Sequence, residues 1–240
     1  MRAEKSIAVD EVSTARPEGP ARRDGRVVMP PMAGPRGRRD EDDGMARHRP
    51  LPREFYARSA AACAPELLGK LLVHEAPEGV LSGVIVETEA YVAENDPANH
   101  AHRGRTERNS PMFGPPGRAY VYFIYGMHHC LNAVCEREGV PEAVLMRALE
   151  PMEGIEVMRR RRAASRYRDL TRGPARLCEA LGITTALNAA DLTAGPLYIA
   201  EGPQRHAERP VVRTTRVGVI AARERRLRWY FRDSDCVSKR

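Results

Sequence analysis

The sequence lacks the features by which several classes of protein are recognised. Its 240 residues include only five cysteines, an odd number without a Cys-x-x-Cys pair, which indicates a reducing compartment and no disulfide framework. No apolar run approaches the ~18–20 residues that span a membrane. The first residues also lack the apolar stretch of a secretory signal. We therefore expect a soluble intracellular protein with no membrane partner.

Common catalytic signatures are missing as well. No glycine-rich phosphate loop or dinucleotide fingerprint follows a predicted strand, and no Gly-x-Ser-x-Gly elbow occurs. The stretch 84–132 carries most of the reactive side chains but contains no lysine, which argues against Schiff-base chemistry there. Histidines stand as His100-x-His102 and His128-His129, and neither spacing matches a common zinc site. A metal centre is therefore the less favoured hypothesis.

Aromatic residues make up only 5% of the chain, and the charges are unbalanced, with a formal net charge of +7. This excess favours an anionic partner without identifying it.

Residues 1–50 are rich in Pro, Gly, Arg and Asp, so they cannot bury enough apolar surface to offset their ordering entropy. We predict a disordered tail over 1–50, with Met45 as an alternative start, and one folded domain over 51–240.

Two apolar, strand-like runs within 84–132 flank a long polar loop. The loop, about 94–117, exceeds the ~12–15 residues of an ordinary connection. In the first run, alternation places Glu87, Glu89 and Tyr91 on one strand face. Two carboxylates beside a tyrosine are costly on a buried face and unremarkable on a solvent-exposed one.

The second run ends in a reversal signal, where Gly126 gives the freedom that a tight turn needs. Tyr125 and Met127 would then lie at a hairpin tip. The loop before it carries arginines, among them Arg105 and Arg108, which could hold phosphates.

Short helices and strands alternate elsewhere without a βαβ rhythm. Helices are expected at 64–69, 152–162 and 174–182, and further strands at 70–74, 143–149, 197–200, 216–220 and 227–231. This order predicts an α+β fold, a single mixed domain with a curved, largely antiparallel β-sheet flanked by short helices.

Two positions outside the central stretch also bear on function. Arg147 interrupts the strand 143–149, either at a strand edge in solvent or aimed at something anionic. Gly173 precedes Pro174 at a helix start and leaves backbone N–H groups open, with Arg176 nearby. That end is a plausible phosphate seat, and the alternative is simply a well-capped short helix.

These parts fit an enzyme that acts on nucleic acid. A base must leave the duplex before chemistry, at an unstacking cost of roughly a few kcal/mol. Tyr125 at a hairpin tip is shaped to fill the gap, and aromatic faces hold the extruded base. A carboxylate can stabilise a cation-like sugar while directing a water. From the residues alone, an ordinary hairpin with a tyrosine-rich core stays open.

Several collinear motifs closely resemble the alkyladenine (3-methyladenine) DNA glycosylase family. They are Val86-Glu87-Thr88-Glu89-Ala90-Tyr91, His100, Arg108-Asn109, Met112-Phe113, Tyr120-Val121-Tyr122-Phe123-Ile124-Tyr125-Gly126-Met127, Leu145-Met146-Arg147-Ala148-Leu149-Glu150-Pro151, Gly173-Pro174, Leu177-Cys178 and Arg216-Val217-Gly218-Val219. The resemblance covers about 51–238. His128 and His129 depart from it, because family members often carry an aromatic residue there.

The resemblance implies a monofunctional DNA glycosylase of base excision repair. Such an enzyme flips alkylated or otherwise damaged purines out of duplex DNA and hydrolyses the N-glycosidic bond, leaving an abasic site, without a metal or an organic cofactor. We expect a monomer whose partner is double-stranded DNA containing damaged purines. In the cell it would be cytoplasmic and nucleoid-associated if bacterial, and nuclear if eukaryotic.

The resemblance also assigns roles to residues of this chain. Glu89 would activate the attacking water, with Glu87 as a structural neighbour. Tyr91, His100 and Tyr122 would line the base pocket, and their electron-rich rings would attract a cationic methylpurine.

Other roles concern the DNA itself. Asn132 would lie beneath the base and oppose the exocyclic amino group of normal guanine. Tyr125 would be the intercalating wedge with Met127 beside it, and Arg147 would hold the phosphate of the flipped nucleotide. The remaining phosphate contacts would come from Arg105, Arg108, Gly173 and Arg176.

Two rival classes stay open at this point. One is a catalytically silent binder of damaged DNA, which the presence of Glu89 disfavours. The other is a metal-dependent nucleic-acid hydrolase that uses His100 and His102.

Overall fold

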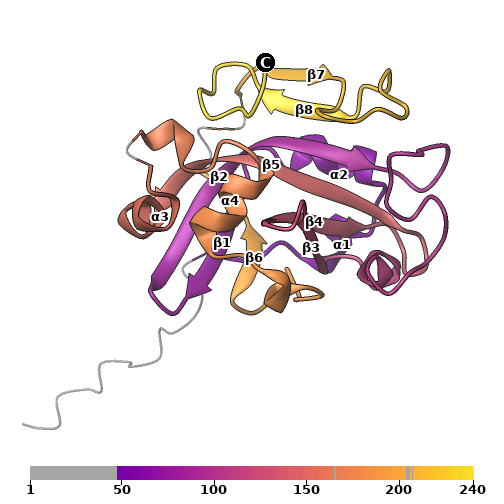
Figure 1. Cartoon of the computed structure of the whole chain (residues 1–240), viewed down its shortest axis with the longest axis horizontal. Coiled ribbons are helices and arrows are strands. Elements are labelled where there is room, and N and C mark those ends of the chain that lie inside the picture. Colours follow the sequence, from indigo (N-terminus) through magenta and orange to yellow (C-terminus); the bar gives the residue numbers. More distant parts are fainter. Residues whose placement is uncertain (1–47, 165, 204–205, 207) are drawn as a thin grey trace, which may run out of the picture. The chain divides into compact units, whose positions relative to one another are not determined.

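An eight-stranded antiparallel sheet is the centre of the fold (Figure 1). In the order of the sheet, six strands are β3 (Ala119–Ile124), β4 (His128–Cys135), β5 (Glu142–Glu153), β2 (Gly79–Tyr91), β1 (Leu71–Ala76) and β6 (Leu197–Ala200). The hairpin of β7 (Val211–Thr214) and β8 (Arg228–Phe231) joins the sheet where β8 pairs with β2. The predicted α+β class with a curved, largely antiparallel sheet is confirmed.

The computed structural model describes residues 48–164, 166–203, 206 and 208–240. The predicted tail over 1–50 therefore lies outside the described residues up to position 47. Four short α-helices flank the sheet: α1 (Arg53–Tyr56), α2 (Ala60–Glu66), α3 (Ile155–Arg162) and α4 (Pro174–Leu181). Helix α2 packs on β2 and β5, and α4 packs on β4 and β5.

Two predicted helices have other boundaries. Helix α2 begins before the predicted 64–69, because the Ser59 side chain caps it by accepting a hydrogen bond from the Ala62 N–H. Pro65 accordingly lies in its last turn instead of its first. Helix α3 begins later than predicted, because β5 continues to Glu153 and Gly154 then turns the chain at φ +71°.

The strand predicted over 216–220 is wrong. The apolar alternation there belongs to a loop, and β7 ends before it at Thr214. Gly218 has φ +74°, a conformation that a strand does not accommodate. This loop returns below as part of the candidate site.

The long polar loop after β2 is ordered by buried amide side chains. The Asn99 amide donates to the carbonyls of Val92 and Pro141 at 2.8 and 2.9 Å. The Asn109 amide donates to the carbonyls of His100 and Gly104, both at 3.0 Å. A small apolar cluster beneath the loop consists of Ala101, Met112, Tyr120, Val134 and Ala143. Side chains that bind backbone can thus order a loop with little core of its own.

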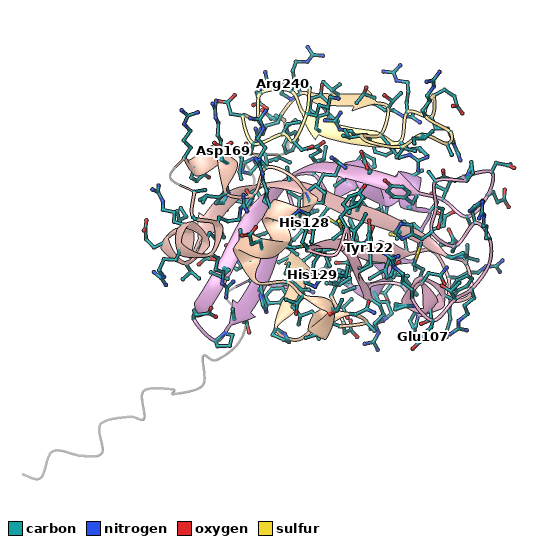
Figure 2. The ribbon with its side chains drawn as sticks, viewed as in Figure 1. Glu107, Tyr122, His128, His129, Asp169 and Arg240 are labelled. Carbon is teal, nitrogen blue, oxygen red and sulfur yellow. The ribbon has the colours of Figure 1, made fainter. Side chains whose placement is uncertain are left out.

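Figure 2 shows Tyr122, His128 and His129 near the centre of the view, over the sheet, and Glu107, Asp169 and Arg240 at its rim. All five cysteines lie among the described residues as free, buried thiols. Within the described part of the chain, each helix is too short or too polar to cross a bilayer.

Candidate active site

Strand β2 carries two carboxylates with no exposed surface, Glu87 and Glu89. They lie on one face, as the alternation predicts, and the pairing of β2 with β5 shifts register on both sides of Glu87. Such bulges are frequent next to active sites, where they redirect a side chain. A buried carboxylate is unfavourable unless cations or N–H groups compensate it, so its partners define its role.

Arg147 on β5 is the cation between the two carboxylates. Its Nε–H donates to Glu87 Oε1 at 3.1 Å and its Nη1–H to Glu89 Oε2 at 3.2 Å, while Nη2–H donates to Ser238 Oγ at 3.1 Å. Burial works against its charge, but Glu89 and Glu87 raise the pKa of Arg147 above its usual value. Of the two open interpretations, Arg147 is therefore not a solvent-exposed edge residue. Two of its five N–H groups remain for another ligand.

Glu87 accepts four hydrogen bonds from the protein. Besides Arg147, it accepts from Arg228 Nε at 2.7 Å, and from the backbone N–H and hydroxyl of Ser238 at 2.6 and 2.9 Å. These partners come from β5, β8 and the segment after β8. Three of these hydrogen bonds end on Oε1 and one on Oε2, and together they tie three parts of the chain to Glu87.

Glu89 accepts fewer hydrogen bonds. The backbone N–H of Val217 donates to Oε1 at 2.7 Å, and the Tyr91 hydroxyl donates to Oε2 at 3.0 Å, beside Arg147. Two carboxylate oxygens have about four acceptor positions, so one stays open for a water. Burial raises the pKa of Glu89, while Arg147, the Val217 N–H and Tyr91 oppose the rise. A raised pKa makes this carboxylate a stronger base than one in water.

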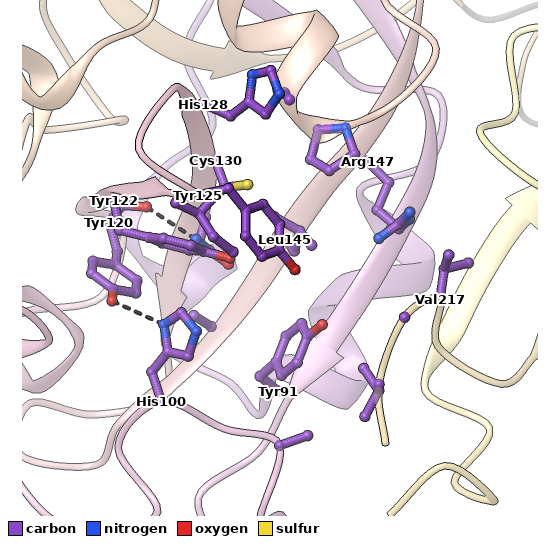
Figure 3. Close-up of a pocket in the computed structure, with 18 of the residues that line it drawn as sticks. Tyr91, His100, Tyr120, Tyr122, Tyr125, His128, Cys130, Leu145, Arg147 and Val217 are labelled. Atoms are coloured by element: carbon purple, nitrogen blue, oxygen red, sulfur yellow. Dashed lines mark hydrogen bonds between the residues drawn. The ribbon is translucent and has the colours of Figure 1, made fainter. Parts of the chain in front are cut away.

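A cavity of about 440 Å³ opens beside this group (Figure 3). That volume lies in the range of small-molecule sites, about 300–1,000 Å³. Figure 3 shows Tyr120, Tyr122 and His100 on one side, Arg147 and Val217 on the other, and Tyr91 between them. The predicted site residues that line it are Tyr91, His100, Tyr122, Tyr125, Asn132 and Arg147.

The aromatic wall of the cavity is uncharged. His100 Nδ1 lies 3.0 Å from the Tyr120 hydroxyl, and its ring meets that of Tyr122 edge-on at 4.6 Å between centroids. Burial, then the charge of Arg108, lowers the pKa of His100, so the imidazole is neutral at neutral pH. Burial raises the pKa of Tyr120 to about 12 and that of Tyr122 further. The wall offers stacking and neutral hydrogen bonds.

Two aromatic rings of the cavity, those of Tyr91 and Tyr122, each have an arginine guanidinium close to one face. The Arg216 guanidinium lies 4.7 Å from the Tyr91 ring centroid, and that of Arg108 lies 5.5 Å from the Tyr122 centroid. Arg108 also donates to the Phe123 carbonyl at 2.7 Å. A bound guanidinium weakens the attraction of a ring for a second cation. The rings are therefore less electron-rich than the sequence implies.

The predicted hairpin is confirmed, with its tip at the cavity mouth. Tyr125 and Gly126 have φ +55° and +70°, and the Met127 N–H donates to the Ile124 carbonyl at 3.3 Å. Positive φ at both central residues is typical of a type I′ turn, although tyrosine rarely adopts it. Tyr125 is 84% exposed and Met127 68%. An exposed aromatic in a strained backbone conformation is the kind of outlier that accompanies function.

The floor and the periphery complete the predicted residues. Asn132 is buried at the cavity wall, and its amide donates to the Tyr120 carbonyl at 3.1 Å. Arg105 stacks on Phe113 at 5.7 Å, outside the cavity wall. The remaining predicted residues outside the cavity wall are Glu89, Met127, Arg108, Gly173 and Arg176, although Pro174 and Ala175 at the start of α4 line it. Glu89 lies directly behind the wall, because its hydrogen-bond partners Tyr91, Arg147 and Val217 are lining residues.

The loop after β7 is a part of the site that the sequence did not predict. Residues 217–221 line the cavity, and Ile220 is 93% exposed at this edge. Apolar alternation alone made this segment look like a strand. Among the described residues, no group of three His, Cys, Asp or Glu side chains is arranged to hold a metal ion.

Comparisons with known proteins agree on one family. Residues 54–235 match the profile of the family described as Methylpurine-DNA glycosylase (MPG). Proteins named "Putative 3-methyladenine DNA glycosylase" from Methanocella arvoryzae and Carboxydothermus hydrogenoformans are 52% and 50% identical, each over 79% of this chain and over 96% and 99% of the relative. A protein of the same name from Rubrobacter xylanophilus is 58% identical over 66% of this chain and 82% of its own length.

Proposed function

The chain belongs to the methylpurine-DNA glycosylase family and is a DNA glycosylase of base excision repair, and from this premise we propose how its cavity releases a damaged purine. It is a hydrolase that cleaves N-glycosyl bonds of damaged bases, and DNA is its substrate. The proposal concerns the residues that carry the reaction and the lesions that they accept.

Glu89 is the proposed general base. The observation that carries the proposal is that Glu89 has one acceptor position without a donor among the described residues, and that its three donors, from Tyr91, Arg147 and Val217, belong to residues that line the cavity. A water bound there gives its proton to the carboxylate as it attacks the sugar carbon, and the base leaves. The negative charge of Glu89 also stabilises the cation-like sugar of the transition state.

Residues at the mouth of the cavity move the damaged nucleotide out of the duplex and hold it there. Tyr125 at the exposed tip enters the duplex in place of the flipped base, with Met127 packing beside it. Arg147 uses its two remaining N–H groups for the phosphate of that nucleotide. Further phosphate contacts come from Arg105, Arg108, Gly173 and Arg176, which lie outside the cavity wall.

The accepted lesions are alkylated and otherwise damaged purines. Tyr91, Tyr122 and His100 stack on the base, and the amide of Asn132 opposes the exocyclic amino group of normal guanine. The cavity wall is uncharged, and a guanidinium already lies on the rings of Tyr91 and Tyr122. Both features favour the binding of neutral lesions such as hypoxanthine in addition to cationic ones. The enzyme acts as a monomer on duplex DNA.

Base release in the presence of EDTA tests this function. We expect the wild-type enzyme to release hypoxanthine or 3-methyladenine from a duplex oligonucleotide at the same single-turnover rate with and without EDTA, because Glu89 activates the water without a metal. The products are the free base and an abasic strand. Release abolished by EDTA would support a metal-dependent hydrolase, and damaged-DNA binding without release of any lesion would support a silent binder.

Arg108→Ala tests the electrostatics of the wall. Removing its guanidinium from Tyr122 should shift the ratio of rates toward cationic 7-methylguanine and away from hypoxanthine by about 3- to 5-fold, equivalent to about 0.5–1 kcal/mol of cation–π energy. The measurement is single-turnover release from two otherwise identical duplexes.

Arg105→Ala is the matched control, because Arg105 stacks on Phe113 outside the cavity wall. An equal loss with both lesions, together with a shallower salt dependence of DNA binding, would instead make Arg108 a phosphate contact alone.

A further inference from the structure

A buried ion pair behind the cavity is not used by the reaction described above. Arg216 Nη1 and Nη2 donate to the two oxygens of Asp96, both at 2.6 Å, and neither side chain has exposed surface. Burial disfavours the charge of Arg216, but the hydrogen bonds and charge of Asp96 raise its pKa above the usual value. Arg216 is therefore charged, and the two parallel hydrogen bonds to Asp96 hold the pair in one geometry.

Arg216 also reaches two parts of strand β2. Its Nη1–H donates to the Ala90 carbonyl at 3.1 Å, and its guanidinium stacks on the Tyr91 ring. Tyr91 in turn donates to Glu89. The next residue in the chain, Val217, donates its backbone N–H to the other oxygen of Glu89. One arginine thus adjoins both neutral donors of this carboxylate.

Asp96 fixes the opposite end of the pair. Its oxygens accept from the backbone N–H groups of Val92 and Ala98 at 3.2 and 3.3 Å, at the start of the long polar loop. Arg216 and Asp96 are 120 residues apart in sequence, so the pair joins two loops that no strand pairing connects. Arg216 Nε–H is buried without an acceptor among the described residues. A buried N–H group without an acceptor lowers the stability of the fold, which suggests that Arg216 is retained because it orients its neighbours.

We propose that Arg216, held by Asp96, is a positioning residue that sets the orientation of Glu89 through Tyr91 and the Val217 N–H. This inference rests on the proposed role of Glu89 as the base. If it is correct, loosening Arg216 turns the open acceptor position of Glu89 away from the cavity without removing any group that touches the substrate. A misplacement of about 1 Å at a reacting centre can lower the rate by about 100-fold.

Arg216→Lys is the sharpest variant. Lysine keeps the charge and can still pair with Asp96, but it lacks the planar fork that spans both oxygens and stacks on Tyr91. We expect a folded protein whose affinity for duplex DNA with an abasic-site analogue changes less than 3-fold, and whose single-turnover rate falls about 10- to 100-fold. A second variant, Asp96→Asn, leaves Arg216 in place with a neutral partner and should lower the rate in the same direction.

The pH–rate profile separates positioning from general damage. Glu89 faces Arg147 on β5, Glu87 and Tyr91 on β2, and the Val217 N–H on the loop. The Val217 N–H lowers the pKa of Glu89, and a base loses activity as pH falls through its pKa. Weakening that bond must therefore move the acid limb of the profile to higher pH. Because lysine retains the charge, the shift reports the lost hydrogen bond.

Arg209→Lys is the matched control. Arg209 also binds a carboxylate with both Nη atoms, that of Glu150 at 2.9 and 2.9 Å, and stacks on Phe231 at 4.4 Å. It does not line the cavity. We expect a lower melting temperature for this variant with the acid limb unmoved.

Each outcome bears on one proposal. Wild-type enzyme that releases no damaged base would remove the proposed function itself. With active wild type, the positioning role is overturned by an Arg216→Lys profile that matches the wild-type profile, or by equal rate losses in the Arg216 and Arg209 variants without a shift. Failure of both Arg216→Lys and Asp96→Asn to fold would assign the pair to stability and overturn it too.

Discussion

Glu89→Gln is expected to abolish base release while damaged DNA is still bound. Removing a general base costs about 10²- to 10⁴-fold in rate, and glutamine cannot stabilise a cation-like sugar with a full negative charge. The amide nitrogen must also face Arg147 or the Val217 N–H, both donors, at a cost of about 1–3 kcal/mol in the free energy of unfolding. Single-turnover release and binding to a duplex with one hypoxanthine measure the two effects.

Glu87→Gln is the control, and for it we expect a loss of stability with most of the rate retained. Glu87 accepts from Arg147, Arg228 and Ser238, and of these three partners Arg228 and Ser238 do not line the cavity. Breaking this buried network should cost about 3–5 kcal/mol in the free energy of unfolding, while the folded fraction keeps most of its rate. If Glu87→Gln instead lost release with its stability intact, the two carboxylates would have to exchange roles.

Tyr125→Asn should weaken base flipping without harming the fold. Loss of the aromatic wedge removes about 1–3 kcal/mol of stacking, which corresponds to roughly 5- to 150-fold in the flipping equilibrium. Asparagine tolerates positive φ better than tyrosine, and Asn-Gly is favoured in a type I′ turn. The melting temperature should therefore stay the same or rise. A fluorescent reporter base opposite the lesion follows the flipping step.

Ala163→Asn supplies the matched control for this turn. Ala163 is exposed, closes α3 at φ +46° and lies outside the cavity wall. The substitution should relieve the same kind of backbone strain and leave flipping unchanged. An unaltered reporter signal in Tyr125→Asn would refute the wedge, and a large fall in its melting temperature would mean that the tyrosine stabilises the hairpin instead.

Local patterns sufficed for the parts of the fold whose reasons are local. The Tyr125-Gly126 turn, strand β6 and the Pro174–Gly182 segment all lie where turn chemistry and apolar runs indicate. The strand predicted over 216–220 is wrong because alternation also occurs in this loop, where Arg216 is buried, Val217 and Val219 are half-buried, and Gly218 and Ile220 are exposed. Gly218 marked the break, since its positive φ ends an extended run.

The residues of the candidate site also divide into those that local sequence patterns predict and those that they do not. Glu89 and Tyr91 share a strand, so their proximity follows from two-residue spacing. The partners that orient Glu89 lie far away in sequence: Arg147 is 58 residues downstream and Val217 is 128. No local pattern specifies such pairs. The sequence alone leaves two interpretations of Arg147, because the carboxylates that it pairs with, Glu87 and Glu89, lie on another strand.

The long sequence separation between Glu87 and Ser238 affects when the buried hydrogen-bond network of Glu87 is complete during synthesis. Ser238, which supplies two of its four donors, follows it by 151 residues. At about 5–20 residues per second, a ribosome adds that stretch in about 8–30 s. Until then Glu87 and Arg147 lack the contacts that seal the carboxylate pair. A chain that lacks Ser238 therefore leaves the buried Glu87 without two of its four donors, which lowers the free energy of unfolding.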